Sequence, residues 1–377
     1  MALTVTVERD PARLEELVTA WMALADRELE PNPFFEPWFL VPALRHLDGM
    51  EHAAVILVSE GRTLLGVLPV LLDALGAATP IYRARMLRHL YSMDHTPLLD
   101  RDRAEEVFRA ALGALAEMRA PALELDHVRS DGHFGELVAS FTAPGGLPTF
   151  VQSAHERALF LPASDAHAYL ERALSPKRRK ELARRERTLG RLGVLALPEL
   201  RPGDRTDPEA TIDAFLALEA AGWKGQARTA LASDARHRIF FEEVIRGGVR
   251  AGRVWMQSVT LDEAPIAMLC SFVSGRGAFS WKIAYDERYA KHSPGLFVEV
   301  VNLRRLHERP EIEWMDSCAS PQHPLIDRLW PDRRAFESRW IATGGTAGRL
   351  FVQLMPLARR VSQGVRRLAR NQHKRVA

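Results

Sequence analysis

The sequence predicts a mixed α/β protein built from two halves of similar order. Segments with strand-like and helix-like periodicity alternate along the 377 residues. A Pro-Gly-Gly-Leu-Pro cluster at residues 144–148 interrupts this alternation near the middle of the chain. After the interruption, a three-strand meander leads into a loop, a helix and one more strand. We therefore expect domains at residues 1–148 and 149–345, followed by a basic amphipathic tail at residues 346–377.

The first half is expected to begin with a helix and to continue with a hairpin. Apolar residues recur at helical spacing between residues 11 and 29. Two β-rich runs, 53–59 and 63–72, are joined at Glu60-Gly61-Arg62, which predicts a tight turn between paired strands. The other elements expected in this half are a strand at 85–91, a helix at 103–118 and a strand at 122–127.

The second half is expected to hold more helices before its meander. The elements expected first are a strand at 149–160 and helices at 165–174, 176–192, 207–221 and 234–250. Strands at 253–261, 265–273 and 278–284 then form the meander, with turns at Asp262-Glu263 and Gly275-Arg276-Gly277. A helix beginning near Pro294 and a strand at 312–316 complete the half.

The composition is that of a globular protein, with 47% hydrophobic and 26% charged residues. Cys270 and Cys318 are the only cysteines, so a disulfide-stapled secreted protein is not expected and a reducing cytoplasm fits better. The first ten residues contain no apolar run of the signal-peptide kind. No stretch approaches twenty uncharged apolar residues. We therefore expect a cytoplasmic protein without a membrane span.

The net charge of +3 is unevenly distributed. Residues 171–191 hold nine basic and three acidic residues, and residues 348–377 hold eight basic residues and no acidic one. The rest of the chain is acidic. This pattern favours two local anion-facing sites over a generally basic nucleic-acid binder, and aromatic residues do not interleave with the charges. We expect no nucleic-acid partner.

Ser293, Pro294 and Gly295 lie between a predicted strand and a predicted helix. Free backbone N–H groups at a helix N-terminus bind anions, and the helix dipole reinforces that binding. Proline fits the first helical turn, and glycine lets the backbone approach a ligand closely. The alternative is an ordinary N-cap serine followed by a proline.

Four stretches together resemble one family. The segment from Ser280 to Phe297 is similar to the acetyl-CoA-binding strand, loop and helix of GNAT N-acyltransferases, in the branch known as cellulose-biosynthesis-type acetyltransferases. That branch itself resembles the tandem-GNAT aminoacyltransferases of peptidoglycan synthesis. The other stretches, in the order of the branch, are a basic helix at 175–187, a Gly-Trp-Lys-Gly turn at 222–225 and a hairpin at 262–267. They cover roughly residues 159–340, and the first half matches only loosely.

The resemblance implies two GNAT-like domains in tandem, with acyl-CoA or acetyl-CoA as co-substrate and neither a permanent cofactor nor a metal. It places Ser293, Pro294 and Gly295 at the CoA pyrophosphate, and the residues it places nearby are Lys282, Tyr285 and Asp286. The sequence departs from the family after residue 316. There it reads Asp-Ser-Cys-Ala-Ser-Pro-Gln-His-Pro in place of the usual Asp-x-Gly and Tyr-Lys pair.

Acyl transfer to an amine needs a group that accepts the ammonium proton and a donor that stabilises the oxyanion. The candidate proton acceptors follow predicted strands, Asp94 and His95 in the first half and Asp316 and His323 in the second. We expect these loops to meet at an acceptor cleft between the halves. Cys318 is a candidate substrate contact, and a nucleophilic role has no accompanying His/Asn signature.

Two further pairs of residues are candidate substrate contacts. Arg178 and Arg179 on the basic helix either form a solvated face or clamp a phosphate of CoA, a nucleotide-sugar or a lipid headgroup. Trp223 and Lys224 either anchor a loop by burying the indole or line the acyl or acceptor channel.

The tail has the pattern of a surface-binding amphipathic helix. Leu357, Val361, Val365 and Leu368 recur at helical spacing, with arginines on the other face. We expect this helix to contact an anionic membrane, to pack on the acidic body or to remain disordered. Membrane contact would make the protein peripheral at the cytoplasmic side of the inner membrane.

The function expected is transfer of an acyl group from acyl-CoA to an amine acceptor at that membrane. The tail and the altered 318–323 segment favour, slightly, a sphingoid-type lipid amine, as in a bacterial ceramide synthase. An amino sugar of an exopolysaccharide precursor is the second acceptor class. A third possibility is a regulatory protein that binds a signalling nucleotide such as cyclic di-GMP.

Overall fold

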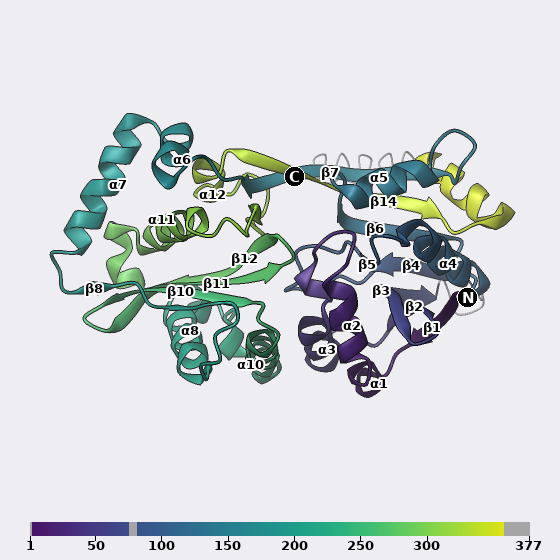
Figure 1. The fold of residues 1–377 in the computed structure, drawn as a ribbon, viewed down its shortest axis with the longest axis horizontal. Coiled ribbons are helices and arrows are strands. Elements are labelled where there is room, and N and C mark those ends of the chain that lie inside the picture. Colours follow the sequence, from purple (N-terminus) through teal and green to yellow (C-terminus); the bar gives the residue numbers. More distant parts are fainter. Residues whose placement is uncertain (1, 75–80, 358–377) are drawn as a thin grey trace, which may run out of the picture.

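A single mixed sheet of fourteen strands runs through both halves of the protein (Figure 1). The structure, a computed structural model, describes residues 2–74 and 81–357. The main path of the sheet is β1-β2-β3-β4-β6-β14-β7-β13-β12-β11-β10-β8, while β5 pairs with β3 and β9 with β10. The mixed α/β fold predicted from the sequence is confirmed.

The first half contains the strands from β1 to β6. They are β1 (Thr4–Glu8), β2 (Ala53–Glu60), β3 (Thr63–Ala74), β4 (Tyr82–Met86), β5 (Leu98–Leu99) and β6 (Ala122–Arg129). The helices of this half are α1 (Pro11–Glu15), α2 (Val18–Ala25), α3 (Pro37–His46), α4 (Ala104–Glu117) and α5 (His133–Phe141). The β2–β3 turn forms as predicted, and Gly61 adopts a positive φ of 59° there, which glycine tolerates without strain. The predicted helix at 11–29 is two helices.

The second half begins with β7 (Thr149–Phe160), which has the predicted bounds. Next come α6 (Ala166–Ala173), α7 (Pro176–Leu189), β8 (Leu195–Ala196), β9 (Glu199–Leu200), α8 (Glu209–Ala221), α9 (Trp223–Gln226) and α10 (Ala235–Arg250). The meander is β10 (Val254–Leu261), β11 (Ala264–Ser274) and β12 (Gly277–Tyr285). A 3-10 turn, η3 (Glu287–His292), then leads into α11 (Pro294–His307), β13 (Trp314–Asp316), α12 (Ile326–Leu329) and β14 (Asp332–Ala342).

β14 joins the two halves of the sheet. It pairs antiparallel with β6 on one side and with β7 on the other, so that Phe336 lies opposite both Arg129 and His155. The end of the predicted second domain therefore completes the sheet of the first. This strand was not predicted from the sequence.

The two halves also share an apolar core. Phe34 and Phe39, which flank the start of α3, pack edge-on against Phe272 of β11 at ring-centroid distances of 6.2 and 5.6 Å. Phe39 also packs edge-on against Trp281 of β12 at a ring-centroid distance of 5.5 Å. Such aromatic contacts between elements of both halves favour one rigid arrangement.

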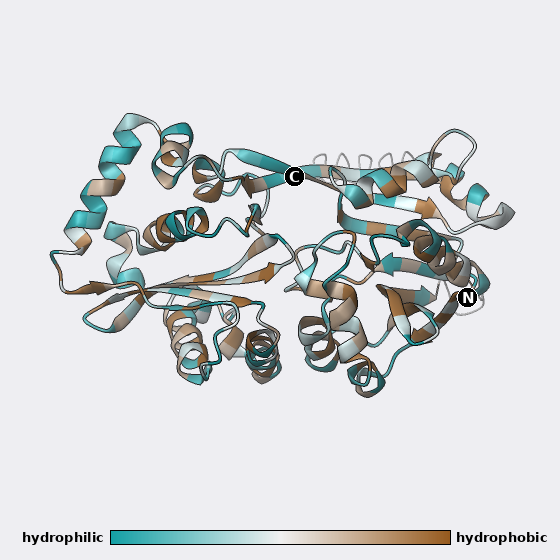
Figure 2. Cartoon of the chain, in the orientation of Figure 1, coloured by the Kyte–Doolittle hydropathy of each residue, from teal (hydrophilic) through white to brown (hydrophobic). Residues whose placement is uncertain are grey.

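In the second half, helices cover both faces of the meander. Figure 1 shows α11 on one face and α8 and α10 on the other. Figure 2 shows that α7, in contrast, is hydrophilic along most of its length. Only Leu182 and Leu189 of this helix are buried.

The last residues that the structure describes, 345–357, form a helix. The rest of the predicted tail lies outside the described residues. Among the residues described, no helix has the length and apolar character needed to cross a membrane.

Candidate active site

The strands β12 and β13 separate soon after they meet. They run parallel and pair only from Gly277 to Phe279 on β12, with Phe279 opposite Asp316. Beyond Asp316 the chain stays against β7, where the Ser317 N–H donates to the Ala158 carbonyl at 3.2 Å. From Ser280 onward, β12 therefore has no strand partner on this side. We call this opening the fork.

A β-bulge shapes β12 at the fork. Cys270 of β11 lies opposite Lys282, and Ser271 lies opposite Ser280, so that Trp281 is the extra residue on β12. A bulge bends the strand and leaves backbone groups outside the regular ladder. The free edge of β12 can therefore offer N–H groups to a ligand carbonyl.

The N-terminus of α11 follows β12 by way of η3. Ser293 is its N-cap and adopts a left-handed conformation, with φ 55° and ψ 56°, and its side chain makes no capping bond. Pro294 has no N–H, and no hydrogen bond within the described part of the chain uses the N–H of Gly295 or Leu296. A fourteen-residue helix thus presents two free donors and its positive dipole end.

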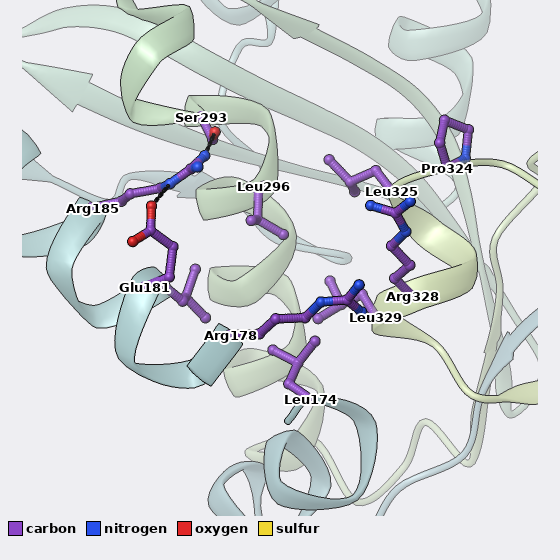
Figure 3. A pocket seen from close by; sticks show the side chains of 11 residues that line it. Leu174, Arg178, Glu181, Arg185, Ser293, Leu296, Pro324, Leu325, Arg328 and Leu329 are labelled. Carbon is purple, nitrogen blue, oxygen red and sulfur yellow. Dashed lines mark hydrogen bonds and ion pairs between the residues drawn. The ribbon is translucent and has the colours of Figure 1, made fainter. Parts of the chain in front are cut away.

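A cavity of about 380 Å³ lies at this helix end, between α7, α11 and α12 (Figure 3). Its walls are largely apolar, with Leu182, Leu296 and Leu329 from the three helices. In Figure 3, Arg178 reaches from α7 and Arg328 from α12 into the space between these helices. The cavity therefore combines an apolar lining with cationic groups.

The side chains of Arg178 and Arg328 are unpaired within the described part of the chain, where neither guanidinium makes an ion pair or a hydrogen bond. A guanidinium at an apolar wall without a carboxylate partner is suited to a phosphate, which it can bind through two parallel hydrogen bonds. Neighbouring Arg179 differs, because it pairs with Glu171 at 3.1 Å and does not line the cavity.

Arg185 connects α7 to the start of α11. Its Nε donates to Glu181 at 2.7 Å, and its Nη1 donates to the Ser293 hydroxyl. Two hydrogen bonds from Arg184 and Arg185 lower the pKa of the Glu181 carboxyl to about 2. The contact holds Ser293 at the cavity wall, where the sequence analysis placed a pyrophosphate.

Gly295 is buried against the sheet. A Cβ at this position would lie 3.2 Å from Cδ1 of Tyr285 and 3.7 Å from Cδ1 of Ile283. Glycine therefore lets α11 approach β12, and Tyr285 lies beneath the helix end. Asp286 does not reach the cavity, because it caps η3 and pairs with Arg288 at 2.6 Å, which lowers the pKa of the Asp286 carboxyl.

Lys282 lies on the other face of the sheet. Its ammonium is 4.4 Å from the centre of the Tyr91 ring, which stacks on Phe240 of α10. Burial lowers the pKa of the lysine to about 8. The structure thus places Ser293 in the lining of the cavity and packs Gly295 against Tyr285, and it does not bring Lys282 to the cavity.

Trp223 and Lys224 lie beside β12. The Lys224 ammonium pairs with the buried Glu219 at 2.8 Å and donates to the Ile283 carbonyl at 3.3 Å. The Trp223 side chain is 55% exposed. The interpretation that this indole is buried as a loop anchor is therefore wrong, while a role in a channel beside β12 stays a prediction.

Asp94 and Asp316 are buried ion-pair partners. The Asp94 carboxylate lies 2.7 Å from Arg129 Nε, and that of Asp316 lies 2.6 Å from Arg157 Nε. Arg157 also donates to the Met93 carbonyl at 2.6 Å, so the two predicted loops do meet at the junction of the halves. Each carboxylate therefore serves to compensate a buried arginine, and removing either partner would leave a buried charge unpaired.

The two candidate histidines lie apart. His95 is buried, with Nδ1 2.8 Å from the Asp126 carbonyl and Nε2 2.9 Å from the Ser92 hydroxyl, and burial lowers its pKa to about 4. His323 precedes α12, and its Nδ1 accepts from the N–H of Ile326, the first residue of that helix, at 3.3 Å. The structure does not bring these two side chains to one cleft.

Cys318 follows Asp316 directly at the junction. Its N–H donates to Asp316 Oδ1 at 2.8 Å, and its φ is 52°. Burial, together with the Asp316 charge, raises the pKa of the thiol well above its usual range. The thiol stays protonated, which argues against a nucleophilic role.

Arg328 and the apolar wall of α12 were not predicted from the sequence. These residues follow the segment at 316–323 where the resemblance ends, and only their position in the chain fold brings them to Ser293. Glu299, a buried glutamate in an otherwise apolar stretch of α11, was not predicted either. The feature of the sequence that could have indicated this residue is a single acidic side chain between Leu-Phe-Val and Val-Val.

A family model of the GNAT acetyltransferase domain matches residues 176–323. No curated protein matches the sequence. The fold is similar to that of FemX, with 11% identity over 86% of this chain and 95% of the other and a TM-score of 0.57. A conserved protein of unknown function from Bacteroides thetaiotaomicron is 8% identical over 90% of this chain and 100% of the other, with a TM-score of 0.55. L-PGS from Bacillus licheniformis is 12% identical over 92% of this chain and 97% of the other, with a TM-score of 0.51.

These likenesses agree with the resemblance found in the sequence. At such identities the solved structures show the fold alone. The family match covers α7, the meander, α11 and the segment up to His323. Residues 176–323 are thus similar to a GNAT acetyltransferase domain, within a mixed α/β fold that both halves share.

Proposed function

We propose that the protein is a GNAT-type acyltransferase that moves an acyl group from acyl-CoA to an amine. The single observation that carries the proposal is the cavity at the start of α11, where the free N–H groups of Gly295 and Leu296 lie near the unpaired Arg178 and Arg328. Backbone donors, a helix dipole and guanidinium groups together are the usual components of a phosphate site. CoA carries a pyrophosphate and a 3′-phosphate for these groups.

The fork gives the rest of the co-substrate a path. A pantetheine arm extended from the start of α11 can run along the free edge of β12 and take the place of the missing strand. A backbone N–H of this edge would then hydrogen-bond the thioester carbonyl and stabilise the oxyanion as the amine attacks. Such fixed donors need no reorganisation during the reaction.

The acceptor is proposed to enter beside Trp223. An indole that is 55% exposed next to β12 offers a flat apolar surface for an acyl chain or a lipid acceptor. This favours, slightly, a lipid amine of the sphingoid kind, so that the product would be a ceramide. An amino sugar of an exopolysaccharide precursor is the second acceptor class, and an indole also stacks well on a sugar ring.

We further propose that the protein acts at an anionic membrane surface. On the helix at 345–357, Leu350, Leu354 and Leu357 are each more than half exposed and recur at spacings of four and three. They form one apolar face, while Val352 is buried on the opposite side. The sequence that follows adds seven basic residues and no acidic one.

A thermal-shift comparison tests the donor. Acetyl-CoA, palmitoyl-CoA and cyclic di-GMP are compared side by side, since a ligand at a hundred times its Kd adds about 2.7 kcal/mol of stability. We expect stabilisation by a CoA thioester that is lost in the Arg178→Ala/Arg328→Ala double variant and kept in Arg187→Ala. Arg187 lies on the same helix outside the cavity.

The outcomes separate the functions. Stabilisation by cyclic di-GMP alone would replace the enzyme by a regulatory nucleotide-binding protein. Thioester binding that is equal in all variants would show that the cavity is not the CoA site. Once a thioester binds, mass spectrometry of lipids and polysaccharide from a deletion strain identifies the acceptor class.

A further inference from the structure

A buried set of polar side chains lies between α11 and the sheet. Its members are Glu299 and Asn302 on α11, Gln257 on β10, Ser271 on β11 and Ser280 on β12. Each is at most 8% exposed. Residues two positions apart on a strand point to the same face of the sheet. Trp255 and Val259, two positions before and after Gln257, pack with apolar residues of α11, so Gln257 points toward the same helix.

This set is only partly hydrogen-bonded. Gln257 Nε2 donates to Asn302 Oδ1 at 2.7 Å, and Asn302 Nδ2 contacts Met315 Sδ at 3.4 Å. Oε2 of Glu299, Oε1 of Gln257 and Oγ of Ser271 have no partner in the described part of the chain. Buried polar atoms without partners are costly, and in native proteins they commonly bind ordered water or serve a function.

The set lies directly beneath the fork. Ser280 is the first residue of β12 beyond its pairing with β13, and Ser271 is its partner on β11. Asn302 reaches Met315 in the middle of β13. Glu299 follows Gly295 by one helical turn, and Gly295 faces β12, so the carboxyl points to the same side of the helix.

The reaction needs a proton acceptor, and three of the four predicted residues are already held by other groups. Asp94 and Asp316 are neutralised by buried arginines. Both nitrogens of His95 are engaged in hydrogen bonds. Glu299 is, within the described residues, a buried carboxyl with no ion pair, and it lies where the thioester would react.

We propose that Glu299 accepts the proton of the attacking amine, by way of the polar side chains and water beneath the fork. This deepens the proposed function and rests on it. As the amine nitrogen forms its bond to the thioester carbon, the C–S bond breaks and its electron pair leaves with CoA as a thiolate. The ammonium proton passes to the Glu299 carboxylate, which then gives it to the thiolate, so that CoA leaves as a thiol.

Burial shifts the pKa of the Glu299 carboxyl into the range that suits a proton acceptor. It raises the pKa of the Glu299 carboxyl to about 7, opposed by the hydrogen bond with Asn302. No charged group contributes to this shift. Titratable groups also lie on the elements packed against α11. On the helix α6 they are His167, Tyr169, Glu171 and Arg172, and on the strands they are Cys270 of β11, Lys282 and Tyr285 of β12, and Asp316 of β13. Glu186 of α7 is paired to Arg304 of α11.

Titration calorimetry of the full chain with acetyl-CoA at pH 7 tests the proposal. Measurements in two buffers of different ionisation enthalpy give the number of protons exchanged on binding. A thioester in the fork displaces water from beside Glu299 and should raise its pKa, so the wild type takes up a fraction of a proton. Glu299→Gln keeps the shape and should bind within about threefold of the wild-type affinity, without this uptake. Glu308→Gln, on the exposed end of the same helix, is the control and should keep the wild-type proton uptake.

Equal proton uptake by the wild type and Glu299→Gln would overturn the assignment to Glu299 while the CoA site stands. A wild type that does not bind acetyl-CoA or palmitoyl-CoA at all would instead overturn the proposed function, and this proposal with it. If Glu299→Gln proves misfolded by circular dichroism, Glu299→Asp replaces it. The shorter acid should retain proton uptake at a shifted midpoint, and uptake unchanged in midpoint would also contradict the proposal.

Discussion

Arg157 on β7 and Asp316 at the end of β13 form a buried ion pair that ties the two halves together. Arg157 Nε lies 2.6 Å from Asp316 Oδ1, its Nη2 donates to Oδ2 at 2.9 Å, and its Nη1 donates to the Met93 carbonyl in the first half. The pair closes the fork at its base. Its role is structural, since both side chains are almost completely buried.

Breaking this pair should destabilise the protein strongly. Asp316→Ala leaves the Arg157 charge buried and uncompensated, which costs about 3–5 kcal/mol. Urea unfolding of the purified variant measures this. Arg172→Ala is the control, because its ion pair with Asp332 is partly exposed and should contribute about 1 kcal/mol at most. Equal, small losses in both variants would show that the junction does not depend on Arg157.

The cationic lining of the cavity should determine the affinity for CoA. A charged hydrogen bond contributes about 1.5–3 kcal/mol, so Arg178→Ala and Arg328→Ala should each weaken acetyl-CoA binding about tenfold or more. Calorimetry at low salt measures the affinities. Arg187→Ala removes the same charge from α7 and should leave the affinity within about twofold. A uniform effect of all three variants would indicate only long-range attraction.

The stability of the protein should report the titration of Glu299. The pKa of its carboxyl is about 7 in the folded state, above the ordinary value of 4.5, so the folded state holds the proton over a pH range in which the unfolded state has lost it. Stability therefore falls as the pH rises from about 4.5 to 7, and the full penalty of about 3 kcal/mol is present above pH 7. Glu299→Gln removes this penalty.

The free energy of unfolding of Glu299→Gln, relative to wild type, should accordingly increase between pH 5 and pH 8. Urea titrations at both pH values measure it. A difference that does not change with pH would mean that Glu299 is ionised throughout, as an exposed glutamate is.

The exposed leucines of the C-terminal helix should contribute to membrane binding. Leu350→Glu with Leu354→Glu places charges on the apolar face and should reduce sedimentation with phosphatidylglycerol vesicles at low salt. Leu90→Glu is the control, because Leu90 is 70% exposed in the first half. Equal binding of all variants to phosphatidylglycerol, or no binding by the wild type, would contradict the proposal.

Local sequence patterns were sufficient for most of the second half. The meander, with turns at 262–263 and 275–277, forms within one or two residues of its predicted bounds. The helix α11 starts at Pro294, because proline fits the first turn. These features depend on residues that are close together in the chain.

Features that depend on distant residues were not predicted. β14 begins with three charged residues and ends with three apolar ones, and its position depends on pairing with both β6 and β7. The helix α3 contains Pro42, and a proline inside a segment disfavours a helix there. Seven of its ten residues are nevertheless buried in the shared core. Its burial outweighs the local preference.

The candidate site divides in the same way. The loop at Ser293 was predicted, whereas Arg328, which lines the same cavity, comes from a segment that only the chain fold brings near. Lys282 was placed at the wrong face, because the bulge at Trp281 changes the alternation of β12. Ion pairing of Asp94 and Asp316 is likewise a long-range feature that local sequence does not reveal.

Hydrogen–deuterium exchange with acetyl-CoA tests the central claim most directly. The claim places CoA phosphates on the free N–H groups at the start of α11, so saturating acetyl-CoA should slow exchange in the peptide that contains Gly295 and Leu296. The same peptide in the Arg178→Ala/Arg328→Ala variant should show little protection at that concentration. Protection by acetyl-CoA that appears elsewhere and leaves residues 293–297 unchanged would contradict the account.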